Sequence, residues 1–184
     1  MLASVPATGG TLQTHYAATG CAQTTHPAAH PKQASIAAIH SVCSGAVPGL
    51  YKYSMPPSGK PKQMFTSSTV SAELGSITWM PDGSFLYFYG SAKWDLDGDK
   101  VPETTGYGIV GLKVATGELT GLLPPLKTGS LYSGIAMSPS GNEMAVCVFD
   151  SKASTYKIYL LDAKNKKTPF SELIGDGKSC RPSW

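Results

Sequence analysis

The sequence predicts an all-β fold built from repeated units of roughly 50 residues. A turn proline recurs at Pro31, Pro81 and Pro139, at spacings of 50 and 58 residues (81 − 31 and 139 − 81), and short apolar stretches flank it as in hairpins. A glycine that follows the motifs PAT, PPS and VAT keeps the same spacing at positions 9, 59 and 117. No segment shows a sustained apolar period of 3.6 residues with caps, so we expect no important helix.

Each unit contains four candidate strands. Four short strands in every 40 to 50 residues are typical of the blades of a β-propeller. A single meander sheet of this kind cannot bury both of its faces, so its neighbours must cover them. The expected strands are 27–29, 34–40, 49–54 and 62–66 in the first unit, 76–80, 84–89, 107–114 and 118–123 in the second, and 133–137, 143–149, 156–162 and 168–173 in the third.

The second unit carries the most specific motif. Trp79, Pro81, Asp82 and Gly83 stand before an apolar strand in a pattern that resembles the TolB-type propeller repeat. The WD-like repeats in the propellers of prolyl oligopeptidase relatives are similar. The third unit keeps Pro139 and a turn glycine, whereas the first replaces the tryptophan by alanine and the Asp-Gly pair by Lys-Gln. The resemblance implies a β-propeller fragment of four-stranded antiparallel meander blades.

The repeat register also divides the chain. We expect three complete blades between two partial ones, as part of a larger protein. The alternative is that two copies form a homodimer that closes one ring. The expected divisions are 1–20 for the end of a preceding blade, 21–70, 71–125 and 126–175 for complete blades, and 176–184 for the first strand of a further blade.

The second unit holds an insertion, residues 94–105, in the loop that joins its second and third strands. In a meander blade this loop and the loop into the first strand lie on the same rim. Asp95, Asp97 and Asp99 alternate along the insertion, and Glu103 follows. Alternate carboxylates on a tight loop are suited to Ca²⁺, which binds six to eight oxygens. The insertion therefore predicts either a calcium site formed by these four residues or a solvated acidic hairpin tip.

The cysteines and histidines allow structural interpretations. No Cys-x-x-Cys motif occurs, which disfavours a zinc ribbon. If the cysteines are oxidised, the positions favour the pairs Cys21–Cys43 and Cys147–Cys180; otherwise they are free, buried, small apolar residues. The four histidines fall within the first 40 residues, and we interpret this clustering as chance. The aromatic residues of the second unit, Tyr87, Phe88, Tyr89 and Trp94, are expected to pack between blades rather than to form a binding patch.

Composition limits the classes of function. A net charge of +3 is too small and too scattered to predict nucleic-acid binding. No apolar run is long enough for a membrane helix, and residues 1–10 lack the pattern of a signal peptide. No G-x-S-x-G motif of a hydrolase nucleophile occurs, and we expect no catalytic residues and no certain cofactor.

We therefore expect a non-catalytic scaffold or binding module for a protein or peptide partner. The resemblance to TolB-type propellers implies a periplasmic or extracellular location. The alternative is a propeller that gates a prolyl-oligopeptidase-like serine peptidase whose catalytic domain lies outside this chain.

Overall fold

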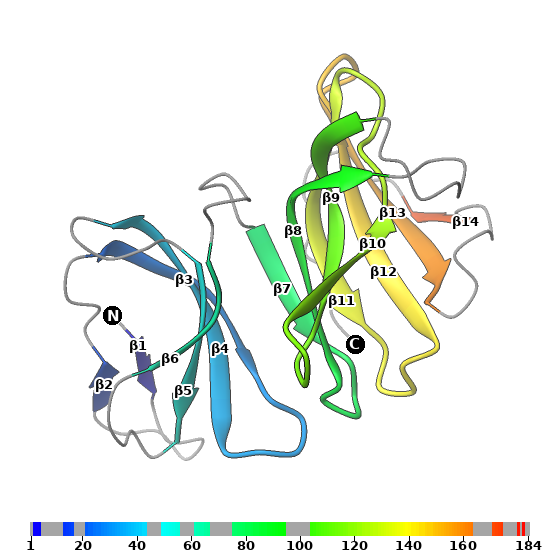
Figure 1. The fold of residues 1–184 in the computed structure, drawn as a ribbon. Helices are drawn as coiled ribbons and strands as arrows, with labels where there is room; N and C mark the ends of the chain where they lie inside the picture. The colour runs from blue at the N-terminus through cyan, green and yellow to red at the C-terminus, as the bar shows by residue number, and fades with distance from the viewer. Residues whose placement is uncertain are drawn as a thin grey trace. The chain divides into compact units, whose positions relative to one another are not determined.

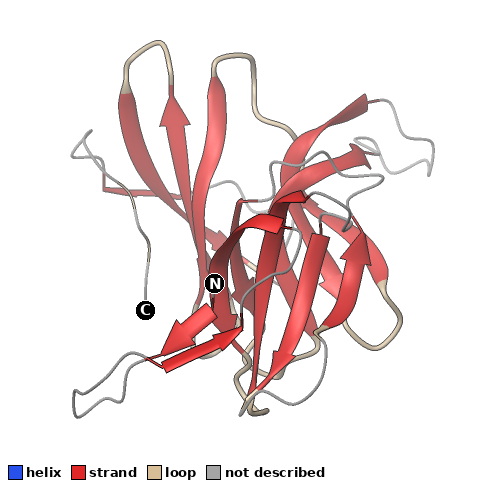
Figure 2. Ribbon diagram, turned by 90° about the vertical axis from the view of Figure 1, so that its left-hand side faces the viewer, coloured by secondary structure: helices blue, strands red, loops and turns tan. Residues whose placement is uncertain are grey.

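The computed structural model describes residues 2–4, 13–16, 21–43, 49–55, 61–66, 75–94, 104–163, 171–174, 180 and 182. The chain divides into two compact units, Met1–Leu74 and Gly75–Trp184, which are described separately. The described residues form strands, turns and loops, without a helix (Figure 2). No helix of the length and apolar character needed to cross a membrane occurs in this described part of the chain.

The first unit contains a two-stranded and a four-stranded antiparallel sheet (Figure 1). The small sheet pairs β1 (Leu2–Ser4) with β2 (Gln13–Tyr16). The larger one, sheet 1, has its strands in chain order. Its strands are β3 (Cys21–Ala29), β4 (Ser35–Cys43), β5 (Gly49–Ser54) and β6 (Lys62–Thr66).

The second unit contains two more four-stranded antiparallel meanders, sheet 2 and sheet 3, so the four-strand repeat predicted from the sequence is confirmed. Sheet 2 has β7 (Gly75–Trp79), β8 (Phe85–Trp94), β9 (Thr104–Lys113) and β10 (Glu118–Leu123). Sheet 3 has β11 (Ser130–Met137), β12 (Glu143–Asp150), β13 (Thr155–Asp162) and β14 (Ser171–Ile174).

The register of the first hairpin is the same in the three sheets. Ala29 pairs with Ile36 in sheet 1, and the residues at the equivalent repeat positions pair in the same way in the others. Trp79 pairs with Leu86, and Met137 pairs with Met144. The alignment based on the turn prolines is therefore correct in the first unit too, where the Trp-x-Pro-Asp-Gly motif is absent.

Each of these turns is closed by a different side chain. In sheet 2 the carboxylate of Asp82 accepts a hydrogen bond from the backbone amide of Ser84 at 2.8 Å. In sheet 3 the hydroxyl of Ser138 accepts one from the amide of Glu143 at 3.1 Å. In sheet 1 the Nδ1 of His30 accepts from the amides of Lys32 and Gln33, both at 3.1 Å. Each turn needs a side-chain hydrogen-bond acceptor, but several residue types can supply it. This explains why the turn motif differs between the three units although the hairpin is the same.

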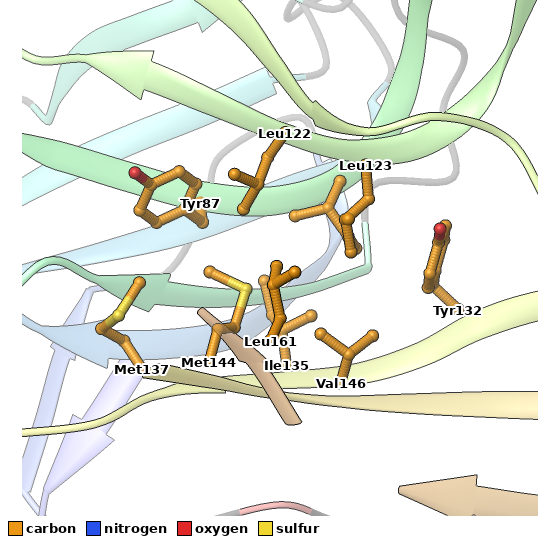
Figure 3. Packing of buried hydrophobic residues seen from close by; sticks show 10 residues of the cluster. Tyr87, Leu122, Leu123, Tyr132, Ile135, Met137, Met144, Val146 and Leu161 are labelled. Atoms are coloured by element: carbon orange, nitrogen blue, oxygen red, sulfur yellow. The ribbon is translucent and has the colours of Figure 1, made fainter. Parts of the chain in front are cut away.

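The main core lies between sheet 2 and sheet 3 (Figure 3). Tyr87 of β8 and Ile109 of β9 face β11 and β12, from which Met137, Met144 and Val146 are buried against them.

Two polar links join β7 to the first strand of sheet 3. The amide of Met137 donates a hydrogen bond to the Thr78 hydroxyl at 3.1 Å. The Ser76 hydroxyl donates one to the Ser133 carbonyl at 3.4 Å. The two sheets thus pack face to face with their first strands adjacent. The buried members of this core are Tyr87, Ile109, Leu122, Leu123, Tyr132, Ile135, Met137, Met144, Val146 and Leu161.

Candidate partner-binding rim

The insertion stands on the two longest strands of the protein's described part. Strands β8 and β9 pair along their whole length, and the last pair is Trp94 with Thr104. The prediction that all of residues 94–105 form a loop is therefore wrong at both ends, because Trp94 lies in β8 and Thr104 and Thr105 lie in β9. The acidic residues Asp95, Asp97, Asp99 and Glu103 lie outside the described residues, so the calcium site remains a prediction. Among the residues that are described, no group of three His, Cys, Asp or Glu side chains is placed to hold a metal ion.

Trp94 fixes the base of this hairpin. Its indole is 4% exposed and lies over Gly108 and Gly121, where an added Cβ atom would come within 2.4 and 2.5 Å of the ring. Its Nε1 donates a hydrogen bond to the carbonyl of Gly106 at 2.9 Å. Only glycine leaves room for the ring at these positions. The sequence signal for this packing is the set of glycines inside strand patterns, which is not part of the repeat motif.

Three tyrosines join sheet 2 to sheet 3 at the same end. The ring of Tyr89 lies 6.0 Å from that of Tyr132, edge to face, and 5.6 Å from that of Tyr107. The Tyr132 hydroxyl donates to the carbonyl of Pro124 at 3.0 Å. Burial, with a smaller contribution from Tyr89, raises the pKa of Tyr132 well above its ordinary value. The hydroxyl therefore remains a donor at physiological pH, and the linker between β10 and β11 is held against the cluster.

We call this end of sheets 2 and 3 the insertion rim: it comprises the base of the insertion at Trp94 and Thr104, the three tyrosines, the linker 124–129 and the β12–β13 turn at 151–154. The Pro125 ring packs on Gly106, where an added Cβ would lie 2.6 Å from the proline Cγ. At the other end of the linker, the carbonyl of Gly129 accepts hydrogen bonds from the amide and the hydroxyl of Ser151, both at 2.7 Å. The next residue but one, Leu131, is 46% exposed. In Figure 1 the linker and the β12–β13 hairpin lie together at the top of the second unit.

The aromatic residues of β8 divide between core and rim. Tyr87 belongs to the core between sheets 2 and 3, and Phe88 is fully buried on the opposite face of β8. Trp94 is buried over the glycines of its own sheet. The expected packing between sheets is thus confirmed for Tyr87 and Tyr89, whereas Trp94 packs within its own sheet. Tyr89 is only half-buried and contributes to the rim.

One of the two expected disulfides is present in the described residues. Cys147 of β12 is bonded to Cys180, with their Cα atoms 6.0 Å apart, and the hydroxyl of Ser133 contacts the Cys147 sulfur at 2.8 Å. The interpretation of Cys147 as a free buried cysteine is therefore wrong. In the backbone register Cys21 and Cys43 are direct partners in β3 and β4, but their side chains lie outside the described residues.

His30 is a structural histidine. It is 8% exposed, and its Nδ1 is used by the two backbone amides of the β3–β4 turn. Burial first, and then the charges of Lys52 and Lys32, lower the pKa of His30 below its ordinary value. His26 is exposed with a φ of 51°, and the side chains of His15 and His40 lie outside the described residues. The described histidines therefore provide no metal site.

No protein-family model and no curated protein matches the sequence. Among solved structures, the β-propeller domain of the Trilobed protease from Pyrococcus furiosus matches with a TM-score of 0.52 and 10% identity, over 84% of this chain and 43% of that one. The fold is that of a β-propeller. Sheets 1, 2 and 3 are its blades, and the fold class predicted from the sequence is confirmed.

Two further solved structures come from peptidases. A structure from a study of two prolyl endopeptidases matches with a TM-score of 0.60 and 15% identity, over 90% of this chain and 24% of that one. Prolyl oligopeptidase B from Galerina marginata matches with a TM-score of 0.52 and 15% identity, over 85% of this chain and 23% of that one. The chain thus spans about a quarter of the length of these peptidases and less than half of the propeller domain. At these identities the likeness establishes the fold alone.

Proposed function

We propose that this chain is a non-catalytic stretch of a TolB-like propeller whose insertion rim binds a protein or peptide partner. The observation that carries the proposal is the tyrosine cluster in which the half-buried Tyr89 and Tyr107 stand on the buried Tyr132, whose hydroxyl holds a linker that contains two prolines. Aromatic residues with a polar tip are enriched in the centres of protein interfaces. Here their backbone is already fixed by Trp94 and by the Tyr132–Pro124 hydrogen bond, so little ordering is needed on binding.

A location outside the cytoplasm is part of the proposal. The Cys147–Cys180 disulfide supports it, because disulfides persist in oxidising compartments and are rare in the cytosol. The calcium site predicted for the acidic insertion, which joins Trp94 of β8 to Thr104 of β9, is part of the same proposal.

Selection from a displayed library of short random peptides tests the rim directly. Peptides enriched on the unmodified chain should lose binding to Tyr107→Ala and Tyr89→Ala. They should keep binding to Glu118→Ala, because Glu118 begins β10 at the opposite end of sheet 2. Peptides that bind all three variants equally well would place recognition elsewhere and contradict the proposal.

A second candidate is the propeller that gates a prolyl-oligopeptidase-like serine peptidase. The likeness to prolyl endopeptidases over 90% of this chain favours it. In this case the catalytic domain lies outside the 184 residues. Sequencing the transcript on both sides of the coding region separates the candidates. A following α/β-hydrolase domain favours the peptidase, whereas a preceding signal peptide with a small domain favours the TolB type.

A further inference from the structure

The net charge of the chain lies entirely in its first unit. Residues 1–74 contain four lysines and one acidic residue, Glu73, so this unit carries a charge of +3 (4 − 1). Residues 75–184 contain the other 11 basic and 11 acidic residues (15 − 4 and 12 − 1) and are neutral overall. Among the residues that the structure describes in the first unit, none is acidic. The lysines described there therefore have no carboxylate partner among those residues.

Two of these lysines stand directly opposite each other. Lys52 of β5 pairs with Lys62 of β6 in the backbone register. Such partners share one face of the sheet with their Cβ atoms about 5 Å apart, and like charges at this position are destabilising. The third and fourth strands of sheet 2 show the favourable arrangement, because Lys113 pairs there with Glu118. The lysine pair of sheet 1 thus concentrates positive charge at a cost in stability that a bound anion would remove.

A third lysine lies at the same corner of sheet 1, in the turn between β3 and β4. The Nζ of Lys52 donates a hydrogen bond to the side-chain oxygen of Gln33 in this turn. Lys32, the residue before Gln33, is exposed, as is Lys62. After burial, the charges of Lys52 and Lys32 are the causes that lower the pKa of His30, so both ammonium groups lie near this turn. We call Lys32, Lys52 and Lys62 the lysine corner.

A buried hydroxyl lies on the same face of the sheet. Ser35 pairs with Ser54, and Ala37, two residues further along β4, pairs with Lys52. Ser35 and Lys52 are therefore diagonal neighbours on one face, within reach of a long side chain. Ser35 is 7% exposed, and its hydroxyl oxygen has no hydrogen-bond partner in the described part of the chain. A buried hydroxyl without a partner is costly and rare in native proteins, so this group is available to a ligand.

We propose that the lysine corner and the Ser35 hydroxyl bind a tetrahedral dianion, either inorganic phosphate or the phosphate monoester of a small molecule. Ammonium groups bind phosphate as point charges, and two phosphate oxygens bridge Lys52 and Lys62. The Ser35 hydroxyl donates to a further oxygen, and Lys32 approaches from the turn. A dianion matches the charge of the cross-strand lysine pair, whereas a single carboxylate neutralises only half of it. The site belongs to the first unit, so the inference is independent of the partner proposed for the insertion rim.

A titration of the intact chain with inorganic phosphate, followed by two-dimensional amide NMR, tests the proposal. It is carried out at slightly alkaline pH, where phosphate is mainly a dianion, with sodium chloride at matched ionic strength as the reference. The amide resonances of Lys32, Gln33 and Ser35 should shift and saturate. The amides of Lys113 and Glu118, the oppositely charged pair of sheet 2, should not move.

Ser35→Ala is the sharpest variant because it removes only the unpartnered hydroxyl. The backbone hydrogen bonds of this residue to His30 and Gln33 remain. Without phosphate, the variant should melt at the same temperature as the unmodified chain or higher, because no native hydrogen bond of the side chain is lost. Its affinity for phosphate should nevertheless fall about tenfold, the usual effect of losing a hydrogen bond to a charged group.

Two lysine variants test the role of charge. Lys62→Gln should weaken phosphate binding about threefold, as expected for an exposed ionic contact. The matched control is Lys113→Gln, which removes an equally exposed lysine of β9 and should leave the affinity unchanged. A parallel titration with glycerol 3-phosphate identifies the source of the dianion. Tighter binding than that of inorganic phosphate indicates a monoester ligand, and weaker binding indicates the free anion.

Each of three results contradicts the proposal. The first is that sodium chloride alone reproduces the shifts at matched ionic strength. The second is an unchanged phosphate affinity in a folded Ser35→Ala chain. The third is an equal loss of affinity in Lys62→Gln and Lys113→Gln, which would reflect net charge alone. The lysines would then serve only to keep β6, an edge strand of sheet 1, from pairing with other chains.

Discussion

The backbone amide of Met137 donates a hydrogen bond to the hydroxyl of Thr78 at 3.1 Å, which joins the first strands of sheets 2 and 3. Tyr87 stands beside Thr78 in the register, and its ring contributes to the core around Met137. The Met137–Thr78 hydrogen bond and the apolar packing of Tyr87 around Met137 therefore lie next to each other between sheets 2 and 3. This joint is the smallest element that distinguishes a stacked pair of sheets 2 and 3 from two independent meanders.

Removal of the Thr78 hydroxyl should loosen this joint. Thr78→Val keeps the shape of the side chain but leaves the Met137 amide without its acceptor, at a cost of about 1 to 2 kcal/mol in the free energy of unfolding. Thr120→Val on the exposed part of β10 is the matched control and should change stability little. Urea unfolding of the intact chain measures the free energy of unfolding of both variants. Equal losses in Thr78→Val and Thr120→Val would contradict the role of the Thr78 hydroxyl.

Gly108 should tolerate no side chain. An added Cβ would lie 2.2 Å from the Leu123 carbonyl and 2.4 Å from the Trp94 ring, so Gly108→Ala should destabilise by about 3 kcal/mol. Gly117 is the control: its φ is +74°, but no atom lies within 4 Å of the added Cβ. Gly117→Ala should therefore cost only about 1 kcal/mol, from backbone strain. A smaller effect at Gly108 than at Gly117 would contradict the packing of Trp94.

The hydroxyl of Tyr132 should contribute to stability through its bond to Pro124. Tyr132→Phe removes the donor and leaves the Pro124 carbonyl unpaired, at a cost of about 1 kcal/mol. Tyr156→Phe on half-buried β13 is the comparison and should be nearly neutral. Thermal unfolding measures the difference, and indistinguishable melting temperatures would refute this role of the hydroxyl.

Stability of the first unit should fall at acidic pH because of His30. Its pKa is lowered in the folded chain, so the unfolded chain binds the proton more readily. The free energy of unfolding is then constant above the unfolded pKa of roughly 6.5 and decreases as pH falls below it. Hydrogen exchange at the amides of Lys32 and Gln33, compared at pH 7.5 and 5.5 after correction for intrinsic rates, should report the loss. In His30→Asn, whose side-chain oxygen replaces the acceptor, this extra pH dependence should disappear.

The acidic insertion should bind calcium if its carboxylates converge. Isothermal titration of the intact chain with Ca²⁺ should then release or absorb heat at millimolar concentration or below, the range of extracellular calcium modules. The variant Asp97→Asn should weaken binding, whereas Asp162→Asn in sheet 3 should not. If titration of the unmodified chain produces no binding heat, the calcium site is refuted and the solvated acidic hairpin tip is the remaining interpretation.

The sequence predicts the backbone of this protein better than its side-chain partners. The proline and glycine spacing determines the strand pairs, because turn geometry and a period of two fix the register of a meander. It places the insertion between the second and third strands of the unit, but it assigns Trp94, Thr104 and Thr105 to the loop, whereas they are paired strand residues. The sequence cannot show that the His30 side chain accepts the turn hydrogen bonds in sheet 1, as the Asp82 carboxylate does in sheet 2. Any side chain that places an acceptor at the right distance from the turn amides can fill this role, whatever its residue type.

The same limit applies to the rim and to the cysteines. The packing of Trp94 over Gly108, and of Pro125 over Gly106, depends on close approach between strands that are distant in the sequence. The choice between a free Cys147 and a bond to Cys180 depends on where the segment after β14 returns to sheet 3. Strand patterns alone do not carry this information.

Sheet 2 packs against sheet 3 in repeat register. Through-space NMR cross-peaks in the intact chain, between the Tyr87 ring and the Met137 methyl group and between the Met137 amide and the Thr78 side chain, measure that packing directly. Both cross-peaks are expected. If the resonances are assigned and both cross-peaks are missing, the two sheets do not stack as adjacent propeller blades.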